Sequence, residues 1–106
     1  MRILARKTLI AYAESRRAHS DHRALKAALD AWFAEVSRAE WQSSAELKEH
    51  YASASVVGDR VVFNVKGNDY RLVVAMDYER QVAFIKWVGT HREYDAIDVR
   101  TVRYGD

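Results

Sequence analysis

Residues 60–76 read RVVFNVKGNDYRLVVAM, and this stretch decides the fold. Apolar residues alternate along both of its arms, and Gly67-Asn68 between the arms is typical of a β-hairpin turn. With a two-residue turn, Asn64 faces Arg71, and every apolar residue likewise faces an apolar one. A register shifted by one residue would bury the charge of Arg71 without a partner, which is costly. The stretch therefore predicts two antiparallel strands in one defined register.

This register places Asn64, Lys66 and Arg71 on the face of the sheet that is turned away from the core. One face of an antiparallel sheet is often simply exposed to water. Arg71, however, lies in mid-strand between bulky apolar residues, and a third strand expected over 82–88 carries one isolated cation, Lys86. We therefore predict a compact cationic site on this face. The face of Lys86 stays open, because its strand is apolar on both sides.

The residues before the hairpin predict helices that cover the other face of the sheet. Residues 7–38 are rich in Ala, Leu, Lys, Arg and Glu, which favour helix. The polar stretch 16–22 indicates a break between two helices, with Ser20 or Asp21 capping the second. Apolar side chains recur after it at helical spacing, and we expect four large ones in the core: Leu25, Trp32, Phe33 and Trp41.

Two shorter elements complete the predicted architecture. Residues 2–6 are compatible with a short strand, and the sequence from Ser43 to Glu46 fits a capping box for a third helix that ends near His50. Helices followed by a run of antiparallel strands are typical of an α+β domain. We therefore expect N-terminal helices packed on one face of a small antiparallel sheet.

A second polar group, VGTHREYD at residues 88–95, follows the third strand. Thr90 can cap one helical turn, on which His91, Tyr94 and Asp95 share one face. A structural histidine, a packed phenol and an ion pair would account for these residues one by one. Beside a cationic face, they instead have the composition of a metal-free phosphodiester site, with cations for the phosphate and His or Tyr for proton transfer.

The composition argues against several other classes of protein. A chain of 106 residues forms one domain, 1–106, and without Cys it has neither disulfides nor thiolate metal ligands. A metal site is disfavoured further because His91 and Asp95 have no third ligand in a telling position. The net charge of +2 is small for a general DNA-binding protein. No apolar run approaches the roughly 18 residues of a membrane span. We expect a soluble, cytoplasmic protein without membrane contact, metal or cofactor.

At residues 60–76 and again at FIKWVGTHREYD, residues 84–95, the sequence resembles the HigB toxins of type II toxin–antitoxin systems, within the RelE-like superfamily of messenger-RNA interferases. RILARKTL at 2–9 and WQSSAELKEHYASASVV at 41–57 are also similar to that family. The resemblance implies the RelE-like α+β fold, with an open concave sheet face for RNA. It implies cleavage of messenger RNA, often on the 70S ribosome, and a HigA helix-turn-helix antitoxin as partner.

The resemblance also implies a mechanism, in which the ribose 2′-OH attacks the adjacent phosphate and no metal takes part. Arg71 would stabilise the charged phosphorane, and Lys66, with Asn64 beside it, would hold the phosphate. His91 would protonate the 5′ oxygen or stabilise charge. Tyr94 would stack on a base or act as acid or base. The general base stays open among a nearby Lys, Tyr94 and His91.

The remaining polar residues would have supporting roles. Asp95 would orient His91, while Asn68, Lys86 and Arg92 would bind RNA. Two alternatives to a nuclease are a module that binds RNA or the ribosome without cutting, and an inactive toxin that acts only in a regulatory complex.

Overall fold

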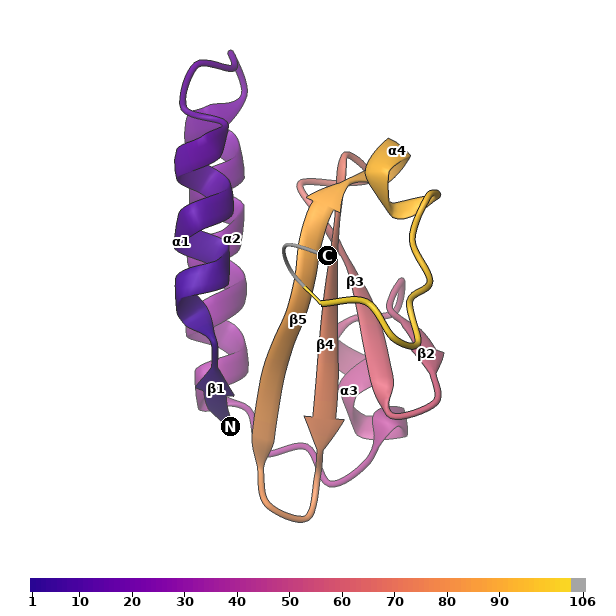
Figure 1. Ribbon diagram of the computed structural model, residues 1–106. Helices are drawn as coiled ribbons and strands as arrows, with labels where there is room; N and C mark the ends of the chain where they lie inside the picture. Colours follow the sequence, from indigo (N-terminus) through magenta and orange to yellow (C-terminus); the bar gives the residue numbers. More distant parts are fainter. Residues whose placement is uncertain (104–106) are drawn as a thin grey trace.

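The computed structural model describes residues 1–103, in which a pair of helices lies beside an open five-stranded sheet (Figure 1). The strands are β1 (Arg2–Leu4), β2 (Ser55–Val57), β3 (Arg60–Val65), β4 (Tyr70–Asp77) and β5 (Val82–Thr90). The helices are α1 (Arg6–Ser15), α2 (His22–Arg38), α3 (Ser44–His50) and α4 (His91–Tyr94). The order of strands in the sheet is β1-β5-β4-β3-β2. The predicted α+β class, with its helices toward the N-terminus, is confirmed.

The predicted antiparallel meander is formed by β3, β4 and β5. β5 extends to Thr90, two residues beyond the predicted end at Val88. The predicted N-terminal strand is present at Arg2–Leu4 and pairs with β5 in parallel, so the complete sheet is mixed. β2 was not indicated by the sequence and pairs with β3 at the opposite edge.

The β3–β4 hairpin has the predicted register, with Asn64 paired to Arg71. The turn departs from strand geometry, because Lys66 and Gly67 have positive φ angles of 52° and 63°. The backbone N–H of Asp69 closes the turn by donating to the carbonyl of Lys66 at 3.2 Å. Lys66 has thus left the ladder, and the alternation of faces that placed it beside Arg71 holds only for residues within the ladder.

The inner face of the sheet, which carries Phe63 and Leu72, packs against α1, α2 and α3. Three of the four predicted core side chains are buried there: Leu25, Trp32 and Trp41. Phe33 is half-buried at the rim of this core, where the guanidinium of Arg6 lies 3.9 Å from the centre of its ring. Among residues 1–103, no helix combines the length and the apolar character needed to cross a membrane.

The predicted cap of α4 is confirmed, whereas those of α3 and α2 are confirmed only in part. In α3 the Glu46 carboxylate accepts from the backbone of Gln42 and not from that of Ser43, so the predicted capping box is incomplete. The Ser43 hydroxyl accepts a hydrogen bond from the backbone of α3 at 3.3 Å. Thr90 caps α4 and forms a complete capping box with Glu93. Asp21 stands at the N-cap of α2, but its carboxylate accepts a hydrogen bond from the hydroxyl of Tyr70 and makes none to the helix.

The outer face of the sheet is apolar in its middle, and residues 96–103 cross it as a C-terminal segment (Figure 1). The side chains that pack together there come from the strands and from this segment: Val62, Val73, Trp87, Ile97, Val99 and Val102. The guanidinium of Arg60, which is only 8% exposed, holds the segment by donating from Nη1 to the carbonyls of Val99 and Val102, at 3.0 and 2.7 Å. The concave face that the resemblance implies is therefore covered in its middle.

Lys86 occupies a β-bulge in the outer face. The pairing of β4 with β5 shifts between Val73 and Val74, and Lys86 is the extra residue of β5 at that point. Its ammonium lies 3.9 Å from the centre of the Phe84 ring, and that ring is 40% exposed. The face of Lys86, which the sequence left open, is thus the outer one.

We predict that Arg60→Met loosens the C-terminal segment. The substitution leaves two carbonyls without their donor, so we expect a loss of about 1–3 kcal/mol in the free energy of unfolding. The amide N–H groups of Thr101 and Val102, which bond to Asp98, should exchange faster with solvent. Urea unfolding and hydrogen exchange measure both effects. Arg80→Met, which removes an exposed surface ion pair, is the matched control, and equal losses in the two variants would contradict the role of Arg60.

Candidate functional site

Arg71 and His91 meet at the end of the sheet where the β3–β4 turn lies beside α4. Arg71 is paired with Asn64 of β3 on one side and with Gly89 of β5 on the other. Its side chain extends from the outer face beside Gly89, which has no side chain. A Cβ atom at Gly89 would lie 2.4 Å from the ring of Trp87. The site therefore requires glycine here, because the indole occupies the space over the backbone.

The guanidinium of Arg71 is fixed by three contacts. Nη1 donates to the carbonyls of Asn68 and Tyr70, at 2.9 and 3.2 Å. Nη2 lies 3.1 Å from Nδ1 of His91. A guanidinium is a donor only and has more N–H groups than these contacts use. Arg71 thus presents a held positive charge that can still bind an anion.

This contact also determines which nitrogen of His91 carries the proton. Because Arg71 can only donate, Nδ1 accepts, and the neutral ring bears its hydrogen on Nε2. The His91 side chain is 58% exposed, so this N–H is accessible. Asp95 Oδ2 lies 4.0 Å from Nε2, too far for a hydrogen bond. Arg71 therefore orients the ring more directly than Asp95, for which the resemblance implies that role.

The other predicted residues of α4 and the hairpin surround this pair. Tyr94 is half-buried, with its ring centre 6.3 Å from that of Trp87, and so it packs on the covered part of the outer face. Arg92 is exposed on α4 next to His91. Asn64 is half-buried opposite Arg71. Asn68 contributes its backbone carbonyl to the site.

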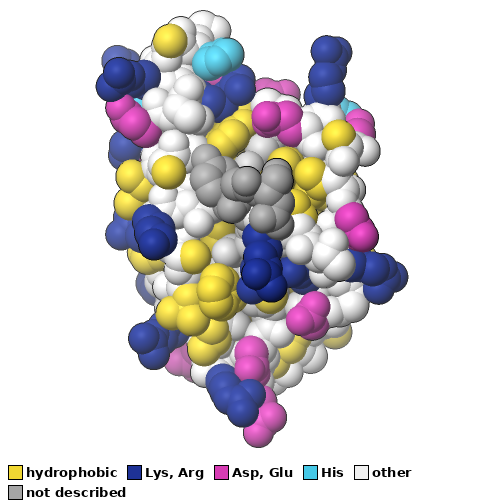
Figure 2. Space-filling view, viewed as in Figure 1, with side chains coloured by type: hydrophobic (Ala, Val, Ile, Leu, Met, Phe, Trp, Pro, Cys, Tyr) yellow, Lys and Arg dark blue, Asp and Glu magenta, His cyan; other side chains and the backbone are white. Residues whose placement is uncertain are grey.

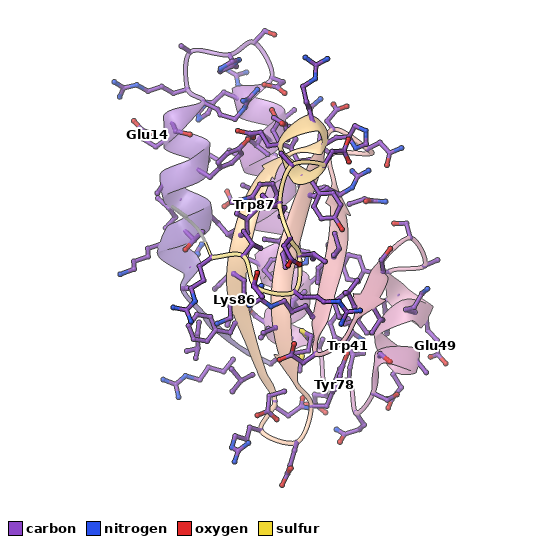
Figure 3. All side chains as sticks on the ribbon, turned by 45° about the vertical axis from the view of Figure 1, so that its right-hand side comes forward. Glu14, Trp41, Glu49, Tyr78, Lys86 and Trp87 are labelled. Carbon is purple, nitrogen blue, oxygen red and sulfur yellow. The ribbon has the colours of Figure 1, made fainter. Side chains whose placement is uncertain are left out.

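The two predicted lysines do not join Arg71. Lys66 Nζ pairs with Asp69 at 2.7 Å, and this hydrogen bond raises the pKa of Lys66. Lys86 lies farther from α4 than Trp87 does (Figure 3). On the face shown in Figure 2, Lys and Arg side chains are spread among acidic ones. The expectation of a compact cationic site is therefore wrong. The candidate site is instead centred on the contact between Arg71 and His91.

The sequence did not predict a polar contact between β4 and the turn that joins α1 to α2. The hydroxyl of Tyr70 donates to Asp21 at 2.5 Å and accepts from Nε of Arg16 at 3.0 Å. The hydrogen bond from Tyr70 lowers the pKa of Asp21. The one signal in the sequence for this contact is the polar stretch 16–22, which by itself indicates only a helix break.

A second unpredicted contact joins α1 to α4. The hydroxyl of Tyr12 donates to Oε1 of Glu93 at 3.1 Å, and the same oxygen accepts from the backbone of Thr90 at 2.7 Å. Partial burial alone would raise the pKa of Glu93, but the hydrogen bonds from Thr90 and Tyr12 lower it below its ordinary value. Nothing in the sequence pairs Tyr12 with Glu93, which are 81 positions apart.

Within residues 1–103, no three His, Asp or Glu side chains are grouped so that they could hold a metal ion. The chemistry available to Arg71 and His91 by themselves is stabilisation of negative charge and transfer of a proton.

A family model described as HigB_toxin, RelE-like toxic component of a toxin-antitoxin system, matches residues 25–97. The match runs from α2 through α4 and includes both Arg71 and His91. Among curated proteins, none matches the chain.

We predict that Glu93→Gln removes a pH-dependent part of the stability. Because the pKa of Glu93 is lowered in the folded state, the carboxylate stabilises the fold above its ordinary pKa of 4.5, and this contribution is lost as the pH falls through the lowered value. The measurement is urea unfolding between about pH 7 and pH 3. At neutral pH the free energy of unfolding of wild type should exceed that of the variant by less than about 1 kcal/mol, because Glu93 is exposed. The difference should shrink in acid, and a difference that does not change with pH would contradict the assignment.

Proposed function

This chain belongs to the HigB family, the RelE-like toxic components of toxin–antitoxin systems, and on that basis we propose that it is an endoribonuclease that cleaves messenger RNA. The observation that carries the proposal is the contact of 3.1 Å between Arg71 Nη2 and His91 Nδ1 at an exposed end of the sheet. A fixed cation and an imidazole with an accessible proton are suited to a phosphodiester that reacts with a neighbouring ribose hydroxyl.

In the proposed reaction, the ribose 2′-OH attacks the adjacent phosphorus and the bond to the 5′ oxygen breaks. Arg71 stabilises the negative charge that grows on the phosphorane oxygens. His91 donates a hydrogen bond from Nε2 to the leaving oxygen and stabilises its negative charge. The leaving oxygen takes up a proton from water, while the proton of the 2′-OH passes to a base on the other side of the phosphate. The products are a 2′,3′-cyclic phosphate and a 5′-OH end. The two side chains stabilise the charge on the phosphorane and on the leaving oxygen, so the proposed step uses no metal.

We propose supporting roles for the residues around this pair. Arg92 is exposed beside His91 and would bind a neighbouring phosphate. Tyr94 would offer the free edge of its packed ring to a base, and Asp95 would attract the protonated form of His91. The residues that would contact RNA farther from the reacting phosphate are Asn64, Lys66, Asn68 and Lys86.

A toxin of a toxin–antitoxin system has an antitoxin as its partner. We propose that this antitoxin is a HigA-type helix-turn-helix protein and that the messenger RNA is cut on the 70S ribosome, in the cytoplasm. The net charge of +2 supports dependence on the ribosome, because a chain with so little excess positive charge attracts free RNA only weakly.

The first prediction concerns the products in cells. Inducible expression in a bacterial host should stop growth, and new 5′-OH ends should appear on translated messenger RNA, in frame with the codons. His91→Ala should abolish these ends, because the leaving oxygen then lacks the hydrogen bond that stabilises its charge. Mapping of 5′ ends is the measurement. Growth arrest without new ends would instead favour a module that binds RNA or the ribosome without cutting.

The second prediction concerns the cation. We expect Arg71→Ala to lower the cleavage rate on the order of 10²-fold or more, the scale of losing one donor to a developing oxyanion. Arg80→Ala is a matched control, because Arg80 also lies beside a hairpin turn but pairs with Asp77 at the opposite end of β4. Cleavage by purified toxin on programmed ribosomes measures both variants. A near-normal rate in Arg71→Ala would exclude this site.

A further inference from the structure

Helix α4 carries His91 but has little to hold it in place. Its four residues, His91–Tyr94, are all exposed or half-buried. A single helical turn is not stable by itself, so its position must come from contacts with the rest of the chain. The first is a backbone hydrogen bond, in which the His91 N–H donates to the carbonyl of Asp69 at 2.9 Å. The second is a ring contact, in which Tyr94 packs on Trp87.

The third contact runs through Glu93 to α1. Glu93 closes the capping box of α4, with its backbone N–H donating to the Thr90 hydroxyl at 3.0 Å and its Oε1 accepting from the Thr90 N–H at 2.7 Å. The hydroxyl of Tyr12 donates to the same Oε1 at 3.1 Å. Tyr12 is 6% exposed in the core and therefore fixed, so it ties the capping box to the body of the protein.

The same face of α1 also supports the other partner of the site. Arg16, the C-cap residue of α1, follows Tyr12 by four positions and donates to the hydroxyl of Tyr70 at 3.0 Å. The rings of Tyr12 and Tyr70 meet edge to face, with centres 6.1 Å apart. The carbonyl of Tyr70 in turn accepts a hydrogen bond from Arg71. One helix thus contacts both the residue beside Arg71 and the helix that carries His91.

We infer that Tyr12 is a positioning residue of the Arg71–His91 site: through Glu93 it holds α4 where Nδ1 of His91 meets Arg71. Tyr12 acts at a distance and does not contact RNA. Its effect on cleavage rests on the proposed function, whereas its effect on the ring of His91 can be measured without any RNA.

The chain contains a matched control for this inference. The hydroxyl of Tyr51 donates to Oε1 of Glu35 at 3.1 Å, the same distance as in the Tyr12–Glu93 pair. In both tyrosines, burial and the neighbouring carboxylate raise the pKa well above its usual range. Tyr51 follows α3 and contacts Trp41 and Phe63, away from α4. Removing either hydroxyl therefore breaks one hydrogen bond to a glutamate. Only the bond of Tyr12 connects to α4 and so to His91.

The experiment compares Tyr12→Phe, Tyr51→Phe and wild type. Thermal unfolding should show similar small losses in the two variants. Two-dimensional ¹⁵N spectra of the imidazoles, with His91 assigned by His91→Gln, should show one tautomer protonated on Nε2 in wild type and Tyr51→Phe. In Tyr12→Phe, the signals of His91 should move toward the average of the two tautomers. A His91 spectrum in Tyr12→Phe that equals that of wild type would overturn the inference.

Kinetics on programmed ribosomes provide the second measurement. Tyr12→Phe should lower kcat on the order of tenfold with little change in KM. The substitution displaces a reacting group but leaves the residues that bind RNA unchanged. Tyr51→Phe should cleave as wild type does. A normal kcat in Tyr12→Phe would count against the inference. If wild type itself does not cleave but the spectra change as expected, the proposed function fails and the positioning role stands.

Discussion

The register of the β3–β4 hairpin is the constraint on which the rest of the structure depends. Successive residues of a strand point to opposite faces, so the pairing of Asn64 with Arg71 sends Tyr70 inward and Arg71 outward. Tyr70 then reaches Arg16 and Asp21 at the turn between α1 and α2, while Arg71 reaches His91. A slip by one residue would exchange these two directions, and both the core contact and the site would be lost together.

Features that depend on neighbouring residues could be predicted from the sequence. The hairpin register follows from the order of apolar and polar residues around one turn, and the cap at Thr90 follows from a threonine placed just after the third strand. The α+β class follows from the change of hydrophobic period along the chain. The pairing of Arg71 with His91 was anticipated only as a shared neighbourhood, because it depends on where β5 ends relative to the β3–β4 turn.

Features that depend on distant residues could not be predicted in this way. Lys66 was expected on the outer face because a parity argument cannot see a backbone that leaves the ladder at positive φ. The bulge at Lys86 depends on the pairing of β4 with β5. The cover over Val73 depends on residues 96–103, whose pattern shows no element of its own. The bond from Tyr12 to Glu93 joins opposite ends of the chain. Apart from Lys66, whose turn is local, the deciding contacts join residues that are far apart in the sequence.

The covered middle of the outer face restricts the exposed chemistry to one end of the sheet and also supports it. Trp87 is buried against the C-terminal segment, its ring fills the space over Gly89, and Tyr94 of α4 packs on it. Arg60 holds that segment through two carbonyls, so a buried cation stabilises the support on which α4 rests. Arg71 thus acts through its fixed position, because Lys66 pairs with Asp69 and Lys86 lies over Phe84, so neither joins it. Preorganised donors of this kind stabilise a transition state without reorganising, but they attract a polyanion poorly from a distance. A site built in this way is consistent with the proposed substrate, a messenger RNA that the ribosome has already aligned.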